Sequence, residues 1–172
     1  MSNLHKILKL GNPKLHELSE SLTEDELPVA LSKASEMHDL IIEYRKNYGA
    51  GRAMAAPQIG YQKRMIALYI DRPLILINPV LYNYSSEMME LWDDCMSFPN
   101  LLVKVRRHKR CSLRFYDENW KEQIKNLEDD FSELIQHEYD HLDGILATQR
   151  AIDDKSFALA GELKNSRRQG QY

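Results

Sequence analysis

Apolar residues recur at intervals of three and four along one stretch of the chain, which is the spacing of an amphipathic helix. The stretch runs from about residue 28 to residue 48, and its apolar positions are Met37, Leu40, Ile41, Tyr44 and Tyr48. Gly49 follows directly, and glycine commonly ends a helix because it adopts the left-handed conformation without strain. The pattern therefore predicts a helix over residues 28–48.

Later segments carry the branched and aromatic residues typical of β-strands. Residues 64–70 and 73–85 are two such runs separated by a short turn, so we expect them to pair antiparallel. Residues 101–107 and 111–120 alternate in part, with one face formed by Leu101, Val103 and Val105 and then by Cys111, Leu113 and Phe115. The residues "DEN" at 117–119 predict a turn, and Cys111 is predicted to be a core residue.

A second helix is predicted near the end of the chain. In "DDFSELIQHEYDHLDG", residues 129–144, the apolar positions with helical spacing are Phe131, Leu134, Ile135 and Leu142. Asp130 suits the N-cap, Glu133 three residues later suits a capping box, and Gly144 suits a stop.

Composition indicates a single globular domain. The chain has 172 residues, of which 43% are hydrophobic and 28% charged, and this balance is typical of globular proteins. We expect one domain over residues 1–165 and a polar tail over residues 166–172. The formal net charge of −3 provides no general attraction for nucleic acid or anionic lipid, and the basic run at residues 106–110 is interpreted as strand charge. Because no signal-peptide or membrane-spanning pattern is visible, we expect a cytoplasmic protein.

The segment "QHEYDHLDG", residues 136–144, concentrates the candidate chemistry. His137 and His141 are four residues apart, so on a helix they lie one turn apart on the same face and can bind one ion. Glu138 lies beside them, and in an H-E-x-x-H arrangement it can exchange a proton with a water molecule. The alternative is a polar helix face with no ligand, but the pattern favours metal binding. A catalytic site of this kind requires a third protein ligand.

Cys95, in "WDDCMSFPN" at residues 92–100, is the candidate for that ligand, because a thiolate supplies soft negative charge to Zn²⁺ or Fe²⁺. The alternative for Cys95 taken alone is a small buried apolar residue. The segment "GAGRAMAAPQIG", residues 49–60, contains small residues that let a backbone approach a ligand, and the amide of Gln58 could donate to an oxyanion. Its alternative is an ordinary loop that joins a helix to a strand.

Three segments in this order resemble the peptide deformylase family: "AMAAPQIG", "DDCMS" and "QHEYDH". The opening "ILKLGNPKL" is also similar to the family's first strand and turn, and the resemblance covers residues 5 to about 147. It implies an α+β fold in which antiparallel sheets surround a central helix that carries the HExxH motif. It also implies a metal-dependent amide hydrolase that removes the N-terminal formyl group from nascent polypeptides beginning with formyl-methionine and releases formate.

The same resemblance implies a role for each matching residue. One divalent ion, Fe²⁺ in most members with Zn²⁺ or another divalent ion as the alternative, would be held by Cys95, His137 and His141. The catalytic groups would be Glu138 as the acid/base and, facing the oxyanion, Gln58 and the backbone N–H of Met96. The residues that orient the ligands would be Asp93, Asp140 and Arg107, with a solvated charged face as the alternative.

Several positions depart from the commonest family pattern. Ala53 stands where a second glycine is usual, and its methyl group would lie against the substrate backbone. Asp93 and Asp94 replace Glu-Gly before the cysteine, and Leu102 stands where many members carry an arginine that can contact the peptide. The acidic stretch at residues 129–133 replaces a small apolar run. These changes surround the substrate rather than the metal ligands.

The expected partner is therefore an N-formylated nascent peptide, with transient ribosome contact possible, no stable nucleic acid or membrane partner, and a monomer by default. One alternative is a related enzyme that acts on another N-formyl or small acyl amide. A second is a metal-binding module without turnover, although Glu138 and Gln58 speak against it. A general zinc protease is less favoured, because its third ligand normally lies downstream of the histidines, where this chain has no further histidine.

Overall fold

The computed structural model describes residues 2–163 of the chain. Its two long helices are α1 (Leu27–Tyr48) and α2 (Asp129–Leu142). The strands in this part of the chain are β1 (Ala53–Ala55), β2 (Met65–Tyr69), β3 (Pro73–Tyr82), β4 (Met88–Asp94), β5 (Leu101–His108), β6 (Arg110–Tyr116), β7 (Glu122–Glu128) and β8 (Phe157–Leu159). Short 3₁₀ turns connect them: η1 (Leu4–Lys6), η2 (Pro13–His16), η3 (Glu24–Glu26), η4 (Ala56–Ile59) and η5 (Ala147–Arg150).

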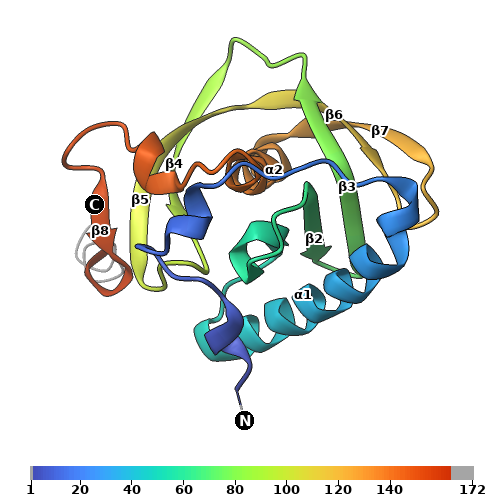
Figure 1. The fold of residues 1–172 in the computed structure, drawn as a ribbon. Coiled ribbons are helices and arrows are strands. Elements are labelled where there is room, and N and C mark those ends of the chain that lie inside the picture. Colours follow the sequence, from blue (N-terminus) through green and yellow to red (C-terminus); the bar gives the residue numbers. More distant parts are fainter. Residues whose placement is uncertain (1, 164–172) are drawn as a thin grey trace.

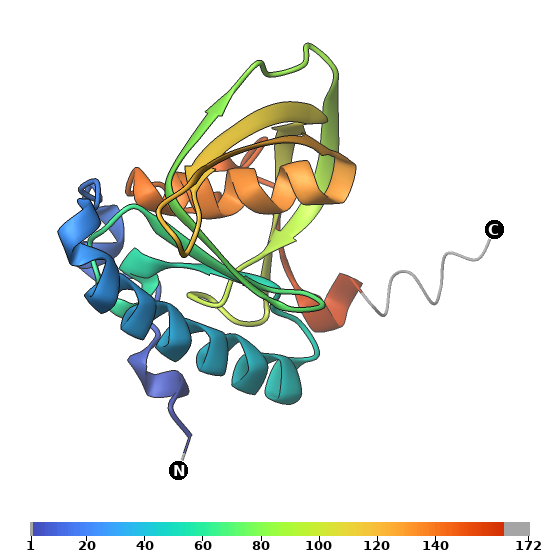
Figure 2. The ribbon, with the colours of Figure 1, turned by 90° about the vertical axis from the view of Figure 1, so that its right-hand side faces the viewer.

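The strands form two antiparallel sheets around α2. The larger sheet has the order β1-β2-β3-β6-β7, and the smaller one has the order β4-β5-β8. Figure 1 views α2 along its axis and shows it at the centre of the fold, with β4 and β5 on one side and β3, β6 and β7 on the other. Figure 2 shows the same helix from the side, with α1 crossing below it. The expected α+β fold with a central HExxH helix is therefore confirmed.

Helix α1 matches its prediction closely. It begins at Leu27 and ends at Tyr48, and Gly49 follows with φ 69° and donates its N–H to the carbonyl of Arg45. The buried face of the helix consists of Ala30, Ala34, Met37, Leu40, Ile41 and Tyr44. Tyr48 was expected on that face but is 46% exposed, with its ring stacked on that of Tyr44 at 4.3 Å.

The carboxyl end of α2 is as predicted, but its amino end is not. The helix begins at Asp129, and Asp130 lies in the first turn rather than at the N-cap. The side chain of Asp130 forms an ion pair with Arg52, which leaves the expected capping box unformed. At the other end, Gly144 has φ 70° and donates its N–H to His141, while the next residue donates to Asp140. These two bonds are the pattern of a Schellman cap.

The predicted strands are present, and the one strand pair that was predicted is confirmed. Strands β2 and β3 pair antiparallel, and the turn after β6 lies at residues 117–120. Val103 and Val105 of β5 are buried, whereas Leu101 is only partly buried. The apolar face of β6 is buried, and Cys111 is 3% exposed, as expected for a core residue. However, β5 belongs to the smaller sheet and β6 to the larger one. The alternation predicted which side chains are buried, but not the sheet in which each strand lies.

The expected first strand is wrong, because residues 7–15 contain no strand in the part of the chain that the structure describes. This segment bridges two loops instead. Leu8 donates its N–H to the carbonyl of Gln58 at 2.8 Å, and Leu10 donates to the carbonyl of Ser97 at 2.8 Å. The N-terminal segment therefore ties the loop after β1 to the loop after β4.

Two expectations concern the chain as a whole. One domain over residues 1–165 stays a prediction, and the polar tail at residues 166–172 lies outside the described residues. Across residues 2–163, none of the helices combines the length and the apolar character needed to cross a membrane.

Candidate metal centre

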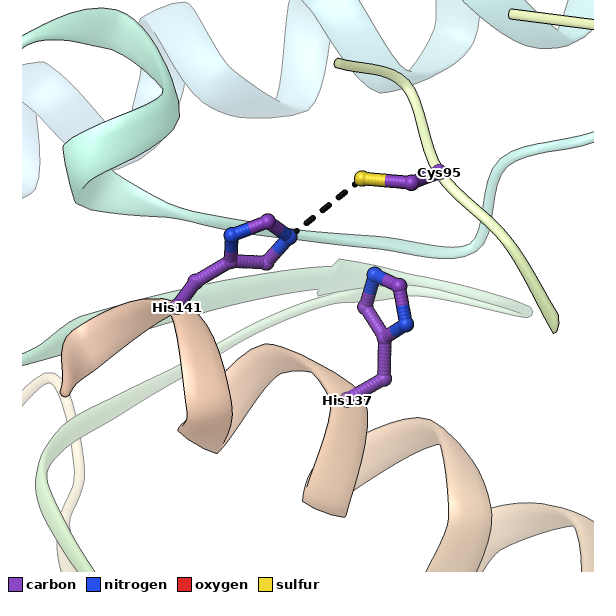
Figure 3. Close-up of side chains that lie close together, drawn as sticks. All are labelled: Cys95, His137 and His141. Atoms are coloured by element: carbon purple, nitrogen blue, oxygen red, sulfur yellow. Dashed lines mark hydrogen bonds between the residues drawn. The ribbon is translucent and has the colours of Figure 1, made fainter. Parts of the chain in front are cut away.

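The side chains of Cys95, His137 and His141 converge in the interior of the protein (Figure 3). Their potential ligand atoms all lie within 4.8 Å of one another, and the sulfur of Cys95 is 3.3 Å from Nε2 of His141. The three residues are between 1% and 5% exposed. A thiol and two imidazoles within this range form a donor set that suits a divalent transition metal.

Two different elements bring these groups together. The histidines lie one turn apart on α2, so their rings share a face, with centroids 5.0 Å apart. Cys95 follows the last residue of β4, where the chain turns and the N–H of Phe98 donates to the carbonyl of Cys95. The N–H of Ser97 points at the sulfur at 3.5 Å. Helix periodicity thus places the imidazoles, and the packing of the smaller sheet against α2, through β5, places the sulfur.

A chain of charged groups orients His137. Its Nδ1 donates to Oδ2 of Asp93 at 2.8 Å, which leaves Nε2 free for an ion. Arg107 donates to the same oxygen of Asp93 at 3.1 Å and also pairs with Asp140. Asp140 in turn accepts from Arg150 at 2.8 Å. The sequence singled out Asp93, Arg107 and Asp140, whereas it gave no signal for Arg150.

The net pKa shifts of the two histidines have opposite signs. Burial lowers the pKa of His137, but Asp93 and the thiol of Cys95 outweigh this effect, so the pKa lies well above 6.5 in the metal-free protein. Burial and the neighbouring charge of His137 hold the pKa of His141 well below 6.5. Burial also raises the pKa of Asp93, but His137 and Arg107 lower it by more, and the net shift is downward. His141 is thus a neutral donor, while an ion at His137 must displace a proton.

Glu138 directly follows His137 on α2. It is 4% exposed, and its Oε2 atom has no hydrogen-bond partner among the described residues. Burial raises the pKa of Glu138 to about 7, helped by Asp93 and Glu133 and opposed by His137. A buried polar atom without a partner costs about 1–3 kcal/mol. Bound water beside a cation would satisfy it, so the surroundings of Glu138 fit a metal site.

The two expected oxyanion donors, Gln58 and Met96, lie beside the cluster and line the same small cavity as Glu138. Oε1 of Gln58 accepts from the N–H of Ala55 at 2.9 Å, which fixes the amide, and Nε2 donates to Ser97 at 3.1 Å and faces the Cys95 sulfur at 3.6 Å. The backbone N–H of Met96 has no acceptor within residues 2–163. One amide hydrogen of Gln58 therefore makes only a long contact, with the Cys95 sulfur. The backbone N–H of Met96 has no acceptor among the described residues and is available to a substrate oxygen.

Two spaces open beside the cluster. A small cavity of about 40 Å³ is lined by Gln58, Cys95, His137 and Glu138, and also by Ala53. A larger groove of about 360 Å³ shares Cys95 with it and contains Leu102. The two positions that depart from the family pattern, Ala53 and Leu102, thus border different spaces.

Sequence reasoning gave two other residues of the small cavity no role in the site. Glu133 was interpreted as a capping residue, yet it is 7% exposed and lies 3.5 Å from Arg52, which also lines the cavity. Burial raises the pKa of Glu133 to about 7, as does the charge of Asp93, while His137 and Arg52 oppose the rise. The spacing of Glu133, four residues before His137, could have revealed that both share one helix face.

Comparison with known proteins gives a consistent result. The family model described as polypeptide deformylase matches residues 4–157. Peptide deformylase 1 of Prochlorococcus marinus (strain MIT 9313) is 37% identical over 94% of this chain and 88% of the relative. A peptide deformylase of Pseudothermotoga lettingae is 33% identical over 96% of this chain and 94% of the relative.

Solved structures agree with these relatives. A class I type b peptide deformylase from Acinetobacter baumannii, bound to Met-Ala-Ser, has a TM-score of 0.76 at 25% identity and covers 84% of this chain and 96% of its own. The peptide deformylase of Thermotoga maritima has a TM-score of 0.74 at 26% identity, over 86% of this chain and 97% of its own.

Proposed function

This chain belongs to the peptide deformylase family, and we propose that it carries out deformylation with Cys95, His137 and His141 as metal ligands and Glu138 as the acid/base. The protein is a metal-dependent hydrolase that removes the formyl group from formyl-methionyl peptides. The single observation that supports the residue assignment is the convergence of the three ligand atoms within 4.8 Å. The unpaired Oε2 atom of Glu138 beside them supports its role.

The proton steps follow from the position of Glu138. A divalent ion at the three ligands supplies positive charge that makes a nearby water molecule more acidic. As the water oxygen bonds to the formyl carbon, one proton passes to the carboxylate of Glu138. The C–N bond then breaks, and its electron pair and the proton from Glu138 go to the amine nitrogen. Formic acid leaves and gives up its remaining proton to solvent, which yields formate. Burial raises the pKa of Glu138 to about 7 in the metal-free protein, and a bound cation would lower it, which favours the carboxylate form that accepts the proton.

Gln58 and Met96 are proposed to stabilise the negative charge that develops on the formyl oxygen. The Gln58 amide is held in place through its Oε1 atom, and the Nε2 hydrogen that makes only a long contact with the Cys95 sulfur, at 3.6 Å, is left to donate to the substrate. The N–H of Met96 needs no rearrangement, because no described residue accepts from it. Loss of one such donor costs about 3 kcal/mol in the transition state.

The size of the small cavity supports a formyl substrate over a longer acyl group. A volume of about 40 Å³ beside His137 and Glu138 leaves room for a hydrogen on the reacting carbon, but not for a peptide chain. The site therefore favours deformylation over general proteolysis.

The bound metal is proposed to be Fe²⁺. A Cys/His/His donor set suits Fe²⁺ and Zn²⁺, and the proposal of Fe²⁺ follows the metal that the resemblance to the peptide deformylase family implies. Metal analysis of protein purified without oxygen, compared with protein purified in air, is the direct test. Iron found in near-equal ratio to the chain in the first sample supports the proposal, and zinc alone in both samples contradicts it.

The cellular setting is proposed from the substrate. Formylated nascent peptides arise where proteins are synthesised, so we place the enzyme in the cytoplasm, acting as a monomer on the emerging N-terminus with at most transient ribosome contact.

A formate-release assay tests the reaction and the role of Glu138 together. The Fe²⁺-loaded enzyme, kept anaerobic, is expected to release formate from a formyl-Met-Ala-Ser peptide. Glu138→Gln is expected to lower kcat at least about 100-fold at unchanged metal content, because it removes the proton acceptor but keeps the shape. Full activity of Glu138→Gln would contradict the mechanism.

The two cysteines provide a matched test of the ligand set. Cys95→Ala is expected to lose the bound ion, whereas Cys111→Ala, also a buried cysteine but in the core, is expected to retain it. Metal content after extensive dialysis measures the difference. Equal metal content in both variants would overturn Cys95 as a ligand.

A further inference from the structure

The peptide group between Met96 and Ser97 connects the proposed metal ligand Cys95 to a lysine of the N-terminal segment. The N–H of this group, which belongs to Ser97, points at the sulfur of Cys95 at 3.5 Å. Its carbonyl oxygen, which belongs to Met96, accepts a hydrogen bond from Nζ of Lys9 at 2.8 Å. The N–H and the C=O of a planar trans peptide group point in opposite directions. The ammonium of Lys9 and the sulfur of Cys95 therefore contact opposite sides of one peptide group.

Lys9 belongs to a short segment that holds both loops beside the cluster. Leu8 donates its N–H to the carbonyl of Gln58 at 2.8 Å, and Leu10 donates its N–H to the carbonyl of Ser97 at 2.8 Å. Lys9 lies between these two anchors, so the backbone on either side of it is fixed. Three consecutive residues thus contact the two loops that contain the proposed oxyanion donors.

The charge of Lys9 is directed at the site rather than at a surface carboxylate. Within residues 2–163, its ammonium has the Met96 carbonyl as its one hydrogen-bond partner and forms no ion pair. Lys6, three residues earlier, instead pairs with Glu36 at 2.7 Å. Partial burial lowers the pKa of Lys9, and the negative charge of Cys95 opposes this shift. The ammonium is thus close enough to the sulfur to interact with it.

A cation on the carbonyl oxygen changes the other end of the peptide group. It draws electron density toward the oxygen, which makes the N–H of Ser97 a stronger donor, because hydrogen bonds in a chain polarise one another. The stronger donor stabilises negative charge on the Cys95 sulfur. The chain from Lys9 to the sulfur is therefore an electrostatic connection as well as a mechanical one.

The same contact restrains the backbone at Met96. The N–H of Met96 is the proposed oxyanion donor and has no acceptor among the described residues, so no bond of its own holds it in place. A donor of this kind is effective only if it is already oriented when charge develops on the substrate. The bond from Lys9 to the carbonyl of the same residue supplies part of that restraint.

We propose that Lys9 is a positioning residue for deformylation: through the carbonyl of Met96 it aims the Ser97 N–H at the Cys95 sulfur and restrains the Met96 N–H that stabilises the oxyanion. The inference rests on the proposed function of the site. Lys9 itself acts only through the peptide group and contacts neither the metal ligands nor the substrate.

Steady-state kinetics provide the first test. Lys9→Met keeps the approximate length of the side chain but removes its charge and its donors. With formyl-Met-Ala-Ser and the Fe²⁺-loaded enzyme, kcat is expected to fall about tenfold, less than the loss of a whole oxyanion donor causes. KM is expected to stay within about twofold, because the restraint acts in the transition state. Metal content is expected to be unchanged.

Two further substitutions separate charge from shape. Lys9→Arg retains a positive donor for the carbonyl and is expected to recover most of kcat. Lys9→Gln removes the charge with a polar side chain and is expected to lower kcat as Lys9→Met does, which provides a second variant should Lys9→Met fold poorly.

The absorption spectrum of the Co²⁺-loaded protein provides a readout that needs no turnover. A thiolate bound to Co²⁺ gives a sulfur-to-cobalt charge-transfer band, and hydrogen bonds to the sulfur influence its energy. A weaker Ser97 N–H leaves more electron density on the sulfur, so the band is expected to move to longer wavelength in Lys9→Met and to return in Lys9→Arg. A general loss of stability would not move the band in this way.

The matched control is Lys6→Met. Lys6 lies in the same N-terminal segment, its side chain is 43% exposed, and its ammonium pairs with Glu36 rather than with either loop. Its substitution is expected to change neither kcat nor the charge-transfer band.

The outcomes separate the inference from the proposed function. A lower kcat together with a shifted band in Lys9→Met, both reversed in Lys9→Arg, supports the inference. A change in only one of the two measurements, in neither of them, or equally in Lys6→Met overturns it and leaves the proposed function standing, because one peptide group serves both effects. No formate from the unaltered enzyme overturns the proposed function, and the inference falls with it.

Discussion

Asp93 accepts a hydrogen bond from Nδ1 of His137 at 2.8 Å, and this contact decides which nitrogen of His137 is available to a metal ion. The carboxylate also increases the basicity of the ring, which strengthens its bond to a cation. The contact joins β4 to α2, the two elements that supply the proposed ligands. Its consequences can be measured.

Asp93→Asn is expected to weaken metal affinity by about 10- to 100-fold, because the amide keeps the size but loses the negative charge that orients and polarises His137. Competition with a chelator of known affinity measures the change. Asp93→Glu is expected to retain more of the affinity than the amide variant does. Asp94→Asn is the matched control, since its side chain is exposed and makes no ion pair among residues 2–163. Equal losses for Asp93→Asn and Asp94→Asn would argue against the orienting role.

The pair also predicts a pH dependence of stability in the metal-free protein. The pKa of His137 is raised above its usual 6.5, so its contribution is complete below pH 6.5 and is lost as pH rises through the raised value. The pKa of Asp93 is lowered below its usual 3.8, so its contribution is complete above pH 3.8 and is lost as pH falls through the lowered value.

The difference in unfolding free energy between the unaltered protein and Asp93→Asn is therefore expected to be largest between pH 3.8 and pH 6.5 and to shrink toward alkaline pH. Denaturant titrations of the metal-free proteins across this range measure it. A difference that grows steadily above neutrality would have the wrong sign. Metal affinity should change in the opposite direction with pH, since a proton on His137 competes with the ion.

Arg107→Leu is expected to destabilise the protein by about 3–5 kcal/mol, because it leaves the buried carboxylates of Asp93 and Asp140 without their shared partner. Arg106→Leu, at the next position, is the control. The side chain of Arg106 is 54% exposed and pairs with Glu90, so its loss is expected to cost about 0.5 kcal/mol or less. Denaturant unfolding at equal metal loading compares the two variants. Equal losses of unfolding free energy would show that Arg107 contributes no more to stability than the exposed Arg106.

Gly144→Ala tests the turn that ends the metal-binding helix. Gly144 has φ 70°, and a Cβ atom there would lie 2.5 Å from the carbonyl oxygen of His16, so backbone strain and a clash add up to about 2–5 kcal/mol. Gly49→Ala is the control, because it has a similar φ of 69° but open space around the added atom. It is expected to cost only about 1–2 kcal/mol. Thermal unfolding of both variants separates the clash from the strain.

Local patterns predicted the elements whose side chains alternate between core and solvent. The helix at residues 28–48 and the buried face of β6 follow such patterns, and both were confirmed. Strands β2 and β3 were predicted from runs of branched and aromatic residues instead, and they were confirmed as well. Strand β7 had no such signal, because only Leu127 is buried in it and Ile124 is 62% exposed. Its strand structure depends on hydrogen bonds to β6 rather than on its own side chains.

The capping interpretation of Asp130 and Glu133 was wrong for a related reason. Both residues have the right type and spacing for a capping box, but Arg52 lies close enough to pair with each of them. Arg52 is far away in the sequence, so no local pattern could include it. An ion pair formed on folding replaced the contact that the sequence favoured.

The amino-acid sequence by itself determined the helix that aligns His137 with His141, because the geometry of one helix is set by neighbouring residues. It also determined the chemical character of the centre, through the types of side chain and the resemblance to a known family. Only the tertiary structure decided that Cys95, 46 positions before His141, lies 3.3 Å from it, that Arg107 is buried between two carboxylates, and that Glu133 faces the small cavity. Such contacts join residues distant in the chain, and they depend on how both sheets pack around α2 rather than on any local preference.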